Sequence, residues 1–301
     1  MRDLHLHLSG ATPPEVLWEI VRESGLKTGA KTYWDFEQHT KMDKVKDLDS
    51  YLKVLHAIDE AQSSPLAVER SVYSAYRSAY LAGCTYLELR WNCVKRSQHG
   101  RIDLDRLIVA GRAGYERARM MYGIQGGMIL CLGRDCTEEE NEALFKKAMQ
   151  YHKKGVIGID IAGPEKHEMP DSFVHYYRAA NAIEMLTTCH VGEYNHDGVD
   201  DEIAFVLEKL KPQRIGHGIQ ITRFPKLMKK AAADRIHFEI CITSNLVTKA
   251  VADTQEMHKI LNIMGENGLE STICTDATFP LNTNIAKETE LLRKILSESP
   301  C

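Results

Sequence analysis

Short apolar runs alternate along this chain with longer segments whose apolar residues recur at helical spacing. A short apolar run bounded by glycine, proline or polar residues is typical of a buried strand, and the longer amphipathic pattern is typical of a helix. The runs that predict strands are residues 3–8, 85–91, 125–132, 156–161, 186–191, 214–217, 237–242 and 271–275. Segments 104–121, 138–153, 200–210 and 254–266 between them predict helices.

A repeated strand–helix alternation predicts a parallel sheet covered by helices. Eight such units in 301 residues fit an α/β fold, the (β/α)8 TIM barrel, whose active site lies at the carboxyl ends of the strands. The first connection is long and predicts a helical insertion after strand 1, with helices over 13–24, 48–61 and 67–81 that would cover the barrel mouth. The rival, a doubly wound open sheet, needs a glycine-rich phosphate loop after its first strand, and the segment SGAT is not one.

Composition narrows the class of protein. The chain is 44% hydrophobic and 27% charged with a net charge of −4, and no basic stretch predicts a groove for a nucleic-acid polymer. No apolar run reaches the length of a membrane span, and we recognise no signal peptide. The eight cysteines contain no CxxC pair, so we expect free thiols in a cytoplasmic, reducing compartment.

Two histidines stand inside the first apolar run, DLHLHLSG. Side chains at i and i+2 of a strand point to the same face, so His5 and His7 would project together, with the leucines opposite. Two neutral imidazoles on one face form half of a metal site. The alternative is a pair of core histidines held by hydrogen bonds.

Further ionisable residues stand where other predicted strands end. His190 and Glu193 follow in CHVGE, His217 in RIGHG and Asp276 in CTDAT. Taken singly, Asp276 could be a helix N-cap, His217 a turn residue and Glu193 a surface carboxylate. Together with the first pair they converge on one barrel mouth, which favours a metal site. Three imidazoles and a carboxylate suit Zn²⁺, although Fe²⁺ or Mn²⁺ would also bind such ligands.

These motifs resemble those of the adenosine deaminase family of the metal-dependent hydrolase superfamily. The resemblance rests on HLHLSGA, DIAGPE, HVGE, RIGHG and the last strand's TD, which occur in the family's order across residues 3–276, and on YLELRW at 86–91. It implies one zinc ion per chain. Members of the superfamily that bind two metal ions use a bridging lysine, and no suitable lysine stands at the end of the fourth predicted strand. The metal ligands that the resemblance implies are His5, His7, His190 and Asp276.

The resemblance also implies the chemistry. A water activated by the metal would attack C6 of an adenine ring, ammonia would leave, and a 6-oxopurine would form. Glu193 would donate a proton to N1, and His217 would orient and deprotonate the water. Asp276 would accept a hydrogen bond from that water, and the backbone N–H of Gly163 would contact N3.

Two substrate contacts of the family are missing. Ser9 stands where an acidic residue usually contacts the ribose 5′-hydroxyl, and Ala277 stands where a second aspartate usually contacts N7. Without a carboxylate at position 9 a 5′-phosphate would meet no like charge there. The sequence therefore leaves adenosine and an adenine nucleotide such as AMP or ATP open as substrates, bound by Ser9 at the 5′ end.

Other readings also stay open. The chain could be another hydrolase of the superfamily acting on an ester, a lactone or a different amino-heterocycle, or a non-catalytic nucleotide-binding domain. Glu193 favours a deaminase, because protonating a ring nitrogen needs an acid and ester hydrolysis does not. We expect residues 1–301 to form a single barrel domain, and the metal strand's start at residue 3 suggests the catalytic domain of a longer polypeptide. A homo-oligomer or an upstream regulatory domain would be compatible with this.

Overall fold

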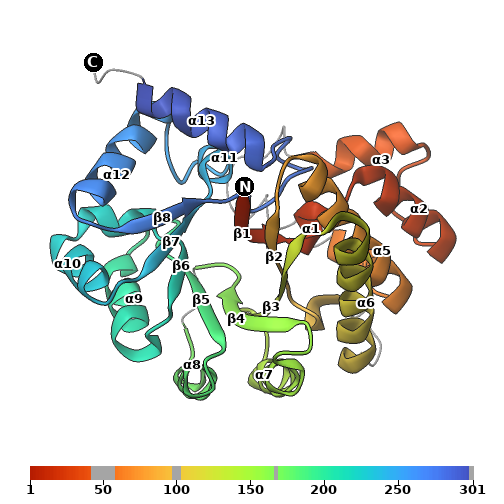
Figure 1. Cartoon of the computed structure of the whole chain (residues 1–301), viewed down its shortest axis with the longest axis horizontal. Coiled ribbons are helices and arrows are strands. Elements are labelled where there is room, and N and C mark those ends of the chain that lie inside the picture. Colours follow the sequence, from red (N-terminus) through yellow and green to blue (C-terminus); the bar gives the residue numbers. More distant parts are fainter. Residues whose placement is uncertain (42–57, 97–102, 166–168, 298–301) are drawn as a thin grey trace.

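Eight parallel strands surround the centre of the molecule in the order of the chain (Figure 1). The computed structural model describes residues 1–41, 58–96, 103–165 and 169–297. The predicted (β/α)8 barrel is confirmed. Its strands are β1 (Arg2–His7), β2 (Tyr86–Trp91), β3 (Gln125–Gly133), β4 (Val156–Ala162), β5 (Leu186–Val191), β6 (Arg214–His217), β7 (His237–Ile240) and β8 (Glu270–Ile273).

The first strand meets the segment after the last strand, which forms the seam of the barrel. Leu6 pairs in parallel with Asp276. The backbone N–H of His7 donates to the Asp276 carbonyl at 2.8 Å, and the N–H of Asp276 donates to the His5 carbonyl at 2.7 Å. Three residues named as site candidates therefore also hold the seam.

Helices surround the strands (Figure 1). The predicted insertion after β1 contains α1, α2, α3 and α5, and the predicted helix 48–61 lies largely outside the described residues, of which 58–61 are helical. The helices are α1 (Leu8–Ala11), α2 (Pro14–Ser24), α3 (Tyr33–Thr40), α5 (Pro65–Leu81), α6 (Leu104–Tyr122), α7 (Glu138–Tyr151), α8 (Ser172–Ala182), α9 (Val199–Phe205), α10 (Pro225–Ala233), α11 (Ile242–Val247), α12 (Thr254–Glu266) and α13 (Ile285–Ser297). Shorter turns are η1 (Val94–Arg96), η2 (Val206–Leu210) and η3 (Ile219–Arg223).

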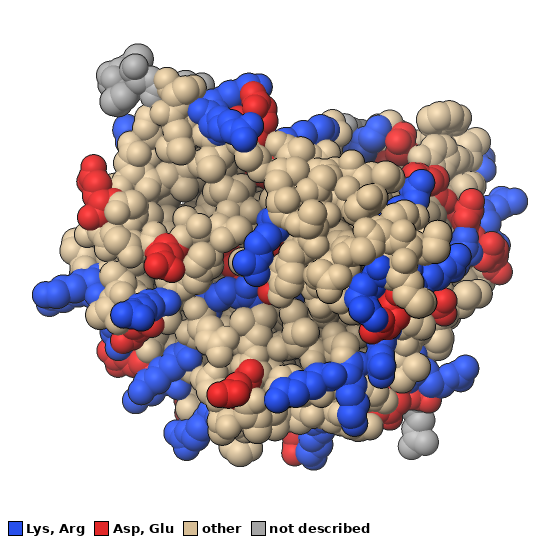
Figure 2. All heavy atoms as spheres, viewed as in Figure 1, with Lys and Arg blue, Asp and Glu red and all other residues tan. Residues whose placement is uncertain are grey.

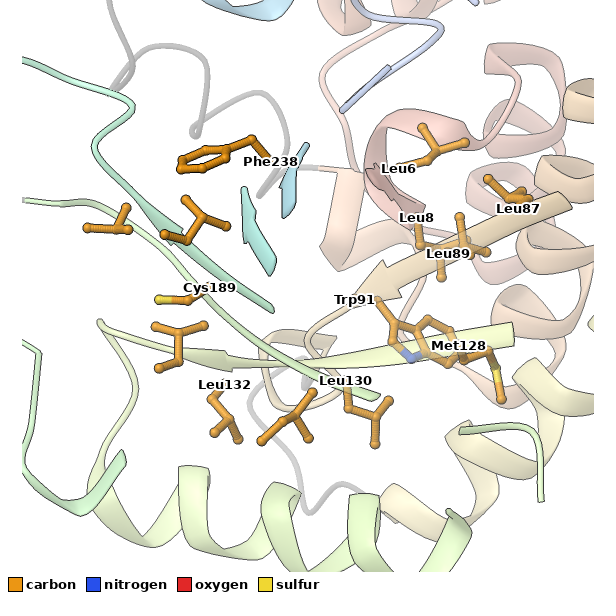
Figure 3. Packing of buried hydrophobic residues seen from close by; sticks show 14 of the residues in the cluster. Leu6, Leu8, Leu87, Leu89, Trp91, Met128, Leu130, Leu132, Cys189 and Phe238 are labelled. Atoms are coloured by element: carbon orange, nitrogen blue, oxygen red, sulfur yellow. The ribbon is translucent and has the colours of Figure 1, made fainter. Parts of the chain in front are cut away.

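The main hydrophobic core includes residues on the outer face of the sheet, and Figure 3 shows part of it. In β2, Leu87, Leu89 and Trp91 belong to this core, whereas the alternate residues Glu88 and Arg90 are buried among polar partners. In β2 the period of two therefore separates an apolar outer layer from a polar interior. The polar interior leads to the site.

Some element boundaries differ from those predicted. Strand β1 ends at His7, because Leu8 begins α1, and its register with β2 shifts between Asp3 and Leu6. The predicted helix 200–210 is divided into α9 and a π-helical turn, η2, a distinction that apolar spacing does not reveal. The predicted strand 237–242 ends at Ile240, since α11 begins two residues later.

The surface carries both signs of charge. On the face in Figure 2, lysine and arginine are interspersed with aspartate and glutamate. Among the helices that the structure describes, none has the length and apolar character needed to cross a membrane. The seven cysteines within the described ranges are all free thiols.

Candidate metal centre and active site

Four side chains converge at the seam. His5 and His7 come from β1, His190 from β5, and Asp276 follows β8. The Nε2 atom of His7 lies 3.3 Å from that of His5 and 3.1 Å from that of His190. The Oδ1 atom of Asp276 lies 3.8 Å from His5 Nε2 and 3.6 Å from His7 Nε2. Ligands about 2.0–2.1 Å from a tetrahedral zinc ion stand about 3.4 Å apart, so the four atoms fit such an ion.

The protonation states also suit a metal. Burial holds the pKa of His5 well below its usual value, and burial lowers the pKa of His7 to about 3. Although burial alone would raise the pKa of Asp276, the neighbouring His7 and His217 hold it below its usual value. Neutral imidazoles with lone pairs and an ionised carboxylate are the forms that bind a divalent cation.

Buried carboxylates orient two of the histidines. His5 Nδ1 lies 2.8 Å from Glu239 Oε2, and His190 Nδ1 lies 3.0 Å from Asp160 Oδ2. A proton on each Nδ1 is thereby directed to a carboxylate, which leaves Nε2 as the lone-pair atom. The hydroxyl of Ser244 donates to Asp276 Oδ2 at 2.6 Å and orients the fourth side chain.

Arg90 connects these carboxylates. Its guanidinium donates to Asp160 at 3.0 Å and to Glu239 at 2.8 Å, and all three side chains are fully buried. Removing one partner from such a buried ionic group leaves an uncompensated charge and costs about 3–5 kcal/mol. The sequence did not reveal that these three residues pair with one another, although a charged residue at alternate positions of an apolar strand is a signal that marks them.

Glu193 and His217 stand beside the four-residue cluster. His217 ends β6, and its Nε2 lies 3.7 Å from Glu193 Oε2, while its Nδ1 lies 3.0 Å from the Asn245 amide nitrogen. Burial raises the pKa of Glu193 well above its usual value, and the charges of Asp276 and Glu165 add to this shift. A raised pKa suits a carboxyl to act as a general acid.

Backbone conformation contributes to the geometry. His217 has φ +57° and Asp276 has φ +60°, in the left-handed region that non-glycine residues rarely adopt. Such strain is common where a side chain must be aimed into a site. The glycine before His217 is explained by contact, since a Cβ at Gly216 would lie 2.9 Å from His5 Cε1.

The structure places the two predicted substrate residues next to the strand ends. Gly163 directly follows β4 with φ +115°, a conformation that favours glycine. Ser9 lies in α1, and its hydroxyl donates to Asp59 Oδ1 at 2.6 Å. The same oxygen lies 2.6 Å from the guanidinium of Arg96. Position 9 therefore has a carboxylate beside it, contrary to the expectation of a neutral hydroxyl alone.

Asp59 was not assigned from the sequence, because it lies in no recognised motif. Position 277 is also explained by packing. Ala277 is fully buried, and a Cβ at Gly10 would lie 2.3 Å from the Ala277 Cβ. The close approach of α1 to this segment leaves little room for a larger side chain.

Known proteins with similar sequences identify the family of this chain. The family model described as adenosine deaminase matches residues 1–297. The chain belongs to the adenosine deaminase family. An adenosine deaminase of Clostridium botulinum (strain Hall) is 26% identical over 97% of this chain and 86% of its own length. An adenosine deaminase of Clostridium kluyveri is 28% identical over 98% of this chain and 83% of its own length.

Solved structures of similar proteins share the fold. The Arabidopsis N6-mAMP deaminase MAPDA is 25% identical with a TM-score of 0.84, over 99% of this chain and 88% of that one. Arabidopsis ADAL in complex with IMP is 25% identical with a TM-score of 0.85, over 99% and 86%. An amidohydrolase from Burkholderia ambifaria, solved with bound zinc, is 23% identical with a TM-score of 0.85, over 99% and 80%.

The family resemblance predicted from the motifs is thus confirmed, and the fold with it. The structure brings together every side chain expected to bind metal, and it places the two expected proton-transfer residues beside them. Their individual roles stay predictions.

Proposed function

We propose that this chain hydrolyses the 6-amino group of an adenine nucleoside or nucleotide, releasing ammonia and a 6-oxopurine. The observation that carries the proposal is a buried Glu193 beside His217 and beside the four clustered side chains that could hold a metal. Family membership supports the aminohydrolase class, and the adenosine deaminase and N6-mAMP deaminase relatives support an adenine substrate.

We propose zinc as the metal, held by His5, His7, His190 and Asp276, whose spacing fits a tetrahedral ion. When bound, zinc supplies a Lewis acid that lowers the pKa of water towards neutrality. The bound zinc in the Burkholderia amidohydrolase supports this choice.

The protein groups would move the protons. Glu193 would give its proton to ring N1, which withdraws electrons from C6 and makes it more reactive towards water. His217, with its pKa lowered by burial, would be neutral and able to take a proton from the attacking water. Gly163 would direct its backbone N–H to N3, and the strained backbone of Asp276 would aim its carboxylate at the water.

The partner of this site is a small purine, and the mixed surface charge gives no support for a nucleic-acid polymer. Free thiols support a reducing, cytoplasmic location. We also propose that the barrel acts as one catalytic domain, as the family match over residues 1–297 supports.

The test is ammonia release from adenine, adenosine, AMP, ADP and ATP by zinc-loaded protein. We expect a 6-oxopurine product from at least one adenosine derivative, detected by the change in ultraviolet absorbance and by chromatography. A panel of esters, lactones and other amino-heterocycles should give no turnover. Turnover of that panel alone would contradict the proposal, and so would tight nucleotide binding without any product.

The contact between Asp59 and Ser9 predicts that a substitution at position 59 changes the substrate preference. Asp59→Asn keeps an acceptor for the Ser9 hydroxyl but removes a negative charge from the region where the family resemblance puts the 5′ group. Like charges brought together at a binding site cost several kcal/mol, so the kcat/KM ratio of AMP to adenosine should rise by at least about tenfold. Steady-state kinetics with both substrates measures the ratio.

Ser9→Ala is the matched control. It removes the hydrogen bond between positions 9 and 59 but leaves the Asp59 charge, so it should change the ratio much less. An unchanged ratio in Asp59→Asn would mean that Asp59 does not face the 5′ end of the substrate.

A further inference from the structure

Glu165 contacts the backbone of the segment that carries Glu193. It lies in the loop after β4, and its side chain is almost fully buried. Its Oε1 accepts the backbone N–H of Glu193 at 3.0 Å, and its Oε2 accepts the N–H of Tyr194 at 3.0 Å. One carboxylate thus binds two successive amides of another loop.

These amides need a partner. Strand β5 ends at Val191, Gly192 turns the chain with φ +66°, and the next residues belong to no helix or strand. Buried N–H groups outside regular structure must find an acceptor elsewhere. Glu165 is that acceptor, and its two bonds fix the backbone direction from which the Glu193 side chain leaves.

The Glu165 carboxylate also lies near charged side chains on the side away from the loop amides. His196 Nε2 lies 3.7 Å from Glu165 Oε2 and 3.4 Å from Glu202 Oε2. Arg134 pairs with Glu202 and donates to the His190 carbonyl at 2.7 Å. The Arg134 guanidinium therefore compensates negative charge of the pair Glu165 and Glu202, and its bond to the His190 carbonyl connects the pair to the end of β5.

We propose that Glu165 is a positioning residue for Glu193: by binding the amides of Glu193 and Tyr194 it aims the Glu193 carboxyl at the substrate and at His217. This inference rests on the proposed function for the role of Glu193 as proton donor. The two hydrogen bonds that define this role run from Glu165 to the backbone of the loop, not to a side chain of the proposed metal site. Glu165 would act on proton transfer and leave metal binding intact.

The test substitution is Glu165→Gln. Glutamine has the same shape, but its NH₂ group would face one of the two N–H groups, so one hydrogen bond is lost and two donors oppose each other. Misplacement of a catalytic group commonly costs about 100-fold. We expect kcat for the best substrate of the adenine panel to fall by about 10- to 100-fold, with KM and zinc content nearly unchanged.

A double-mutant cycle with Glu193→Gln distinguishes positioning from general damage. If Glu165 acts through Glu193, the double variant should be no slower than Glu193→Gln alone. Glu288→Gln is the matched control, since Glu288 is also a buried glutamate that accepts a backbone N–H, that of Thr243, on other elements. Its effect should multiply with that of Glu193→Gln. If the kcat losses of Glu165→Gln and Glu193→Gln multiply fully in the double variant, the proposal is wrong.

Hydrogen exchange gives a readout that needs no activity. Mass spectrometry of a peptide covering residues 192–196 should show faster amide exchange in Glu165→Gln than in wild type, at an unchanged melting temperature. An unchanged exchange rate would contradict the proposal that Glu165 holds the amides of Glu193 and Tyr194. Should Glu165→Gln fail to fold, Glu165→Asp, which keeps the charge but shortens the reach, takes its place with the same expected results. If wild type turns over no adenine compound, the proposed function fails. The exchange measurement still shows whether Glu165 holds the amides of Glu193 and Tyr194.

Discussion

Glu193→Gln is expected to lower kcat by about 10²- to 10⁴-fold, the range found when a general acid is removed. The amide has the size of the carboxyl and keeps its hydrogen-bonding atoms, but it holds no proton that it can transfer to a ring nitrogen. Burial, together with the charges of Asp276 and Glu165, raises the pKa of this carboxyl and so favours its protonated form. The measurement is steady-state deamination with zinc content determined on the same samples.

Zinc content should stay near that of wild type, because Glu193 contributes none of the four clustered ligand atoms. Glu290→Gln, the same change on the exposed surface of α13, should leave turnover unaffected. Turnover within a few-fold of wild type in Glu193→Gln would remove this residue from the mechanism.

His7→Ala is expected to abolish stable zinc binding and, with it, deamination. Wild type should hold about one zinc ion per chain, since the cluster supplies one set of four ligands. Loss of a residue that hydrogen-bonds to a metal ligand and orients it costs about 10–100-fold in metal affinity, and loss of a ligand should cost more than that. Metal analysis and competition with a chelator of known affinity measure the change.

The variant should still fold, because the bonds of His7 across the seam are made by its backbone. His175→Ala, at an exposed histidine of α8, is the control and should retain the metal. A stoichiometry near two in wild type, or full metal retention in His7→Ala, would refute the assignment.

Much of this architecture could be predicted from the chain because strands and catalytic residues leave local signals. Each strand is a short apolar run, and the expected side chains lie within motifs at the strand ends, where the barrel brings them together. The ends of the elements were less certain, since α11 follows β7 without any break in apolar character. The division of one helix into α9 and η2 had no sequence signal.

The supporting contacts could not be predicted in the same way, because they join residues far apart in the chain. Arg90 meets Glu239 across the barrel interior, and nothing near either residue specifies the other. Asp59 reaches Ser9 from 50 residues further along the insertion, which changed the expected environment of the substrate's 5′ end. Glu165 stood within a recognised motif, but its contact with the loop after β5 depends on how two connections pack.

The position of the seam has a consequence for biosynthesis. His5 and His7 leave the ribosome before the other ligands, whereas Asp276 emerges only after the other seven strands have been made. Domains fold as units during synthesis, and contacts between distant segments form late. A nascent chain therefore carries two imidazoles of the centre long before it carries the carboxylate and the backbone bonds that close around them. Capture of the metal by the complete ligand set must await the last strand, so metal loading would report that the barrel has finished folding.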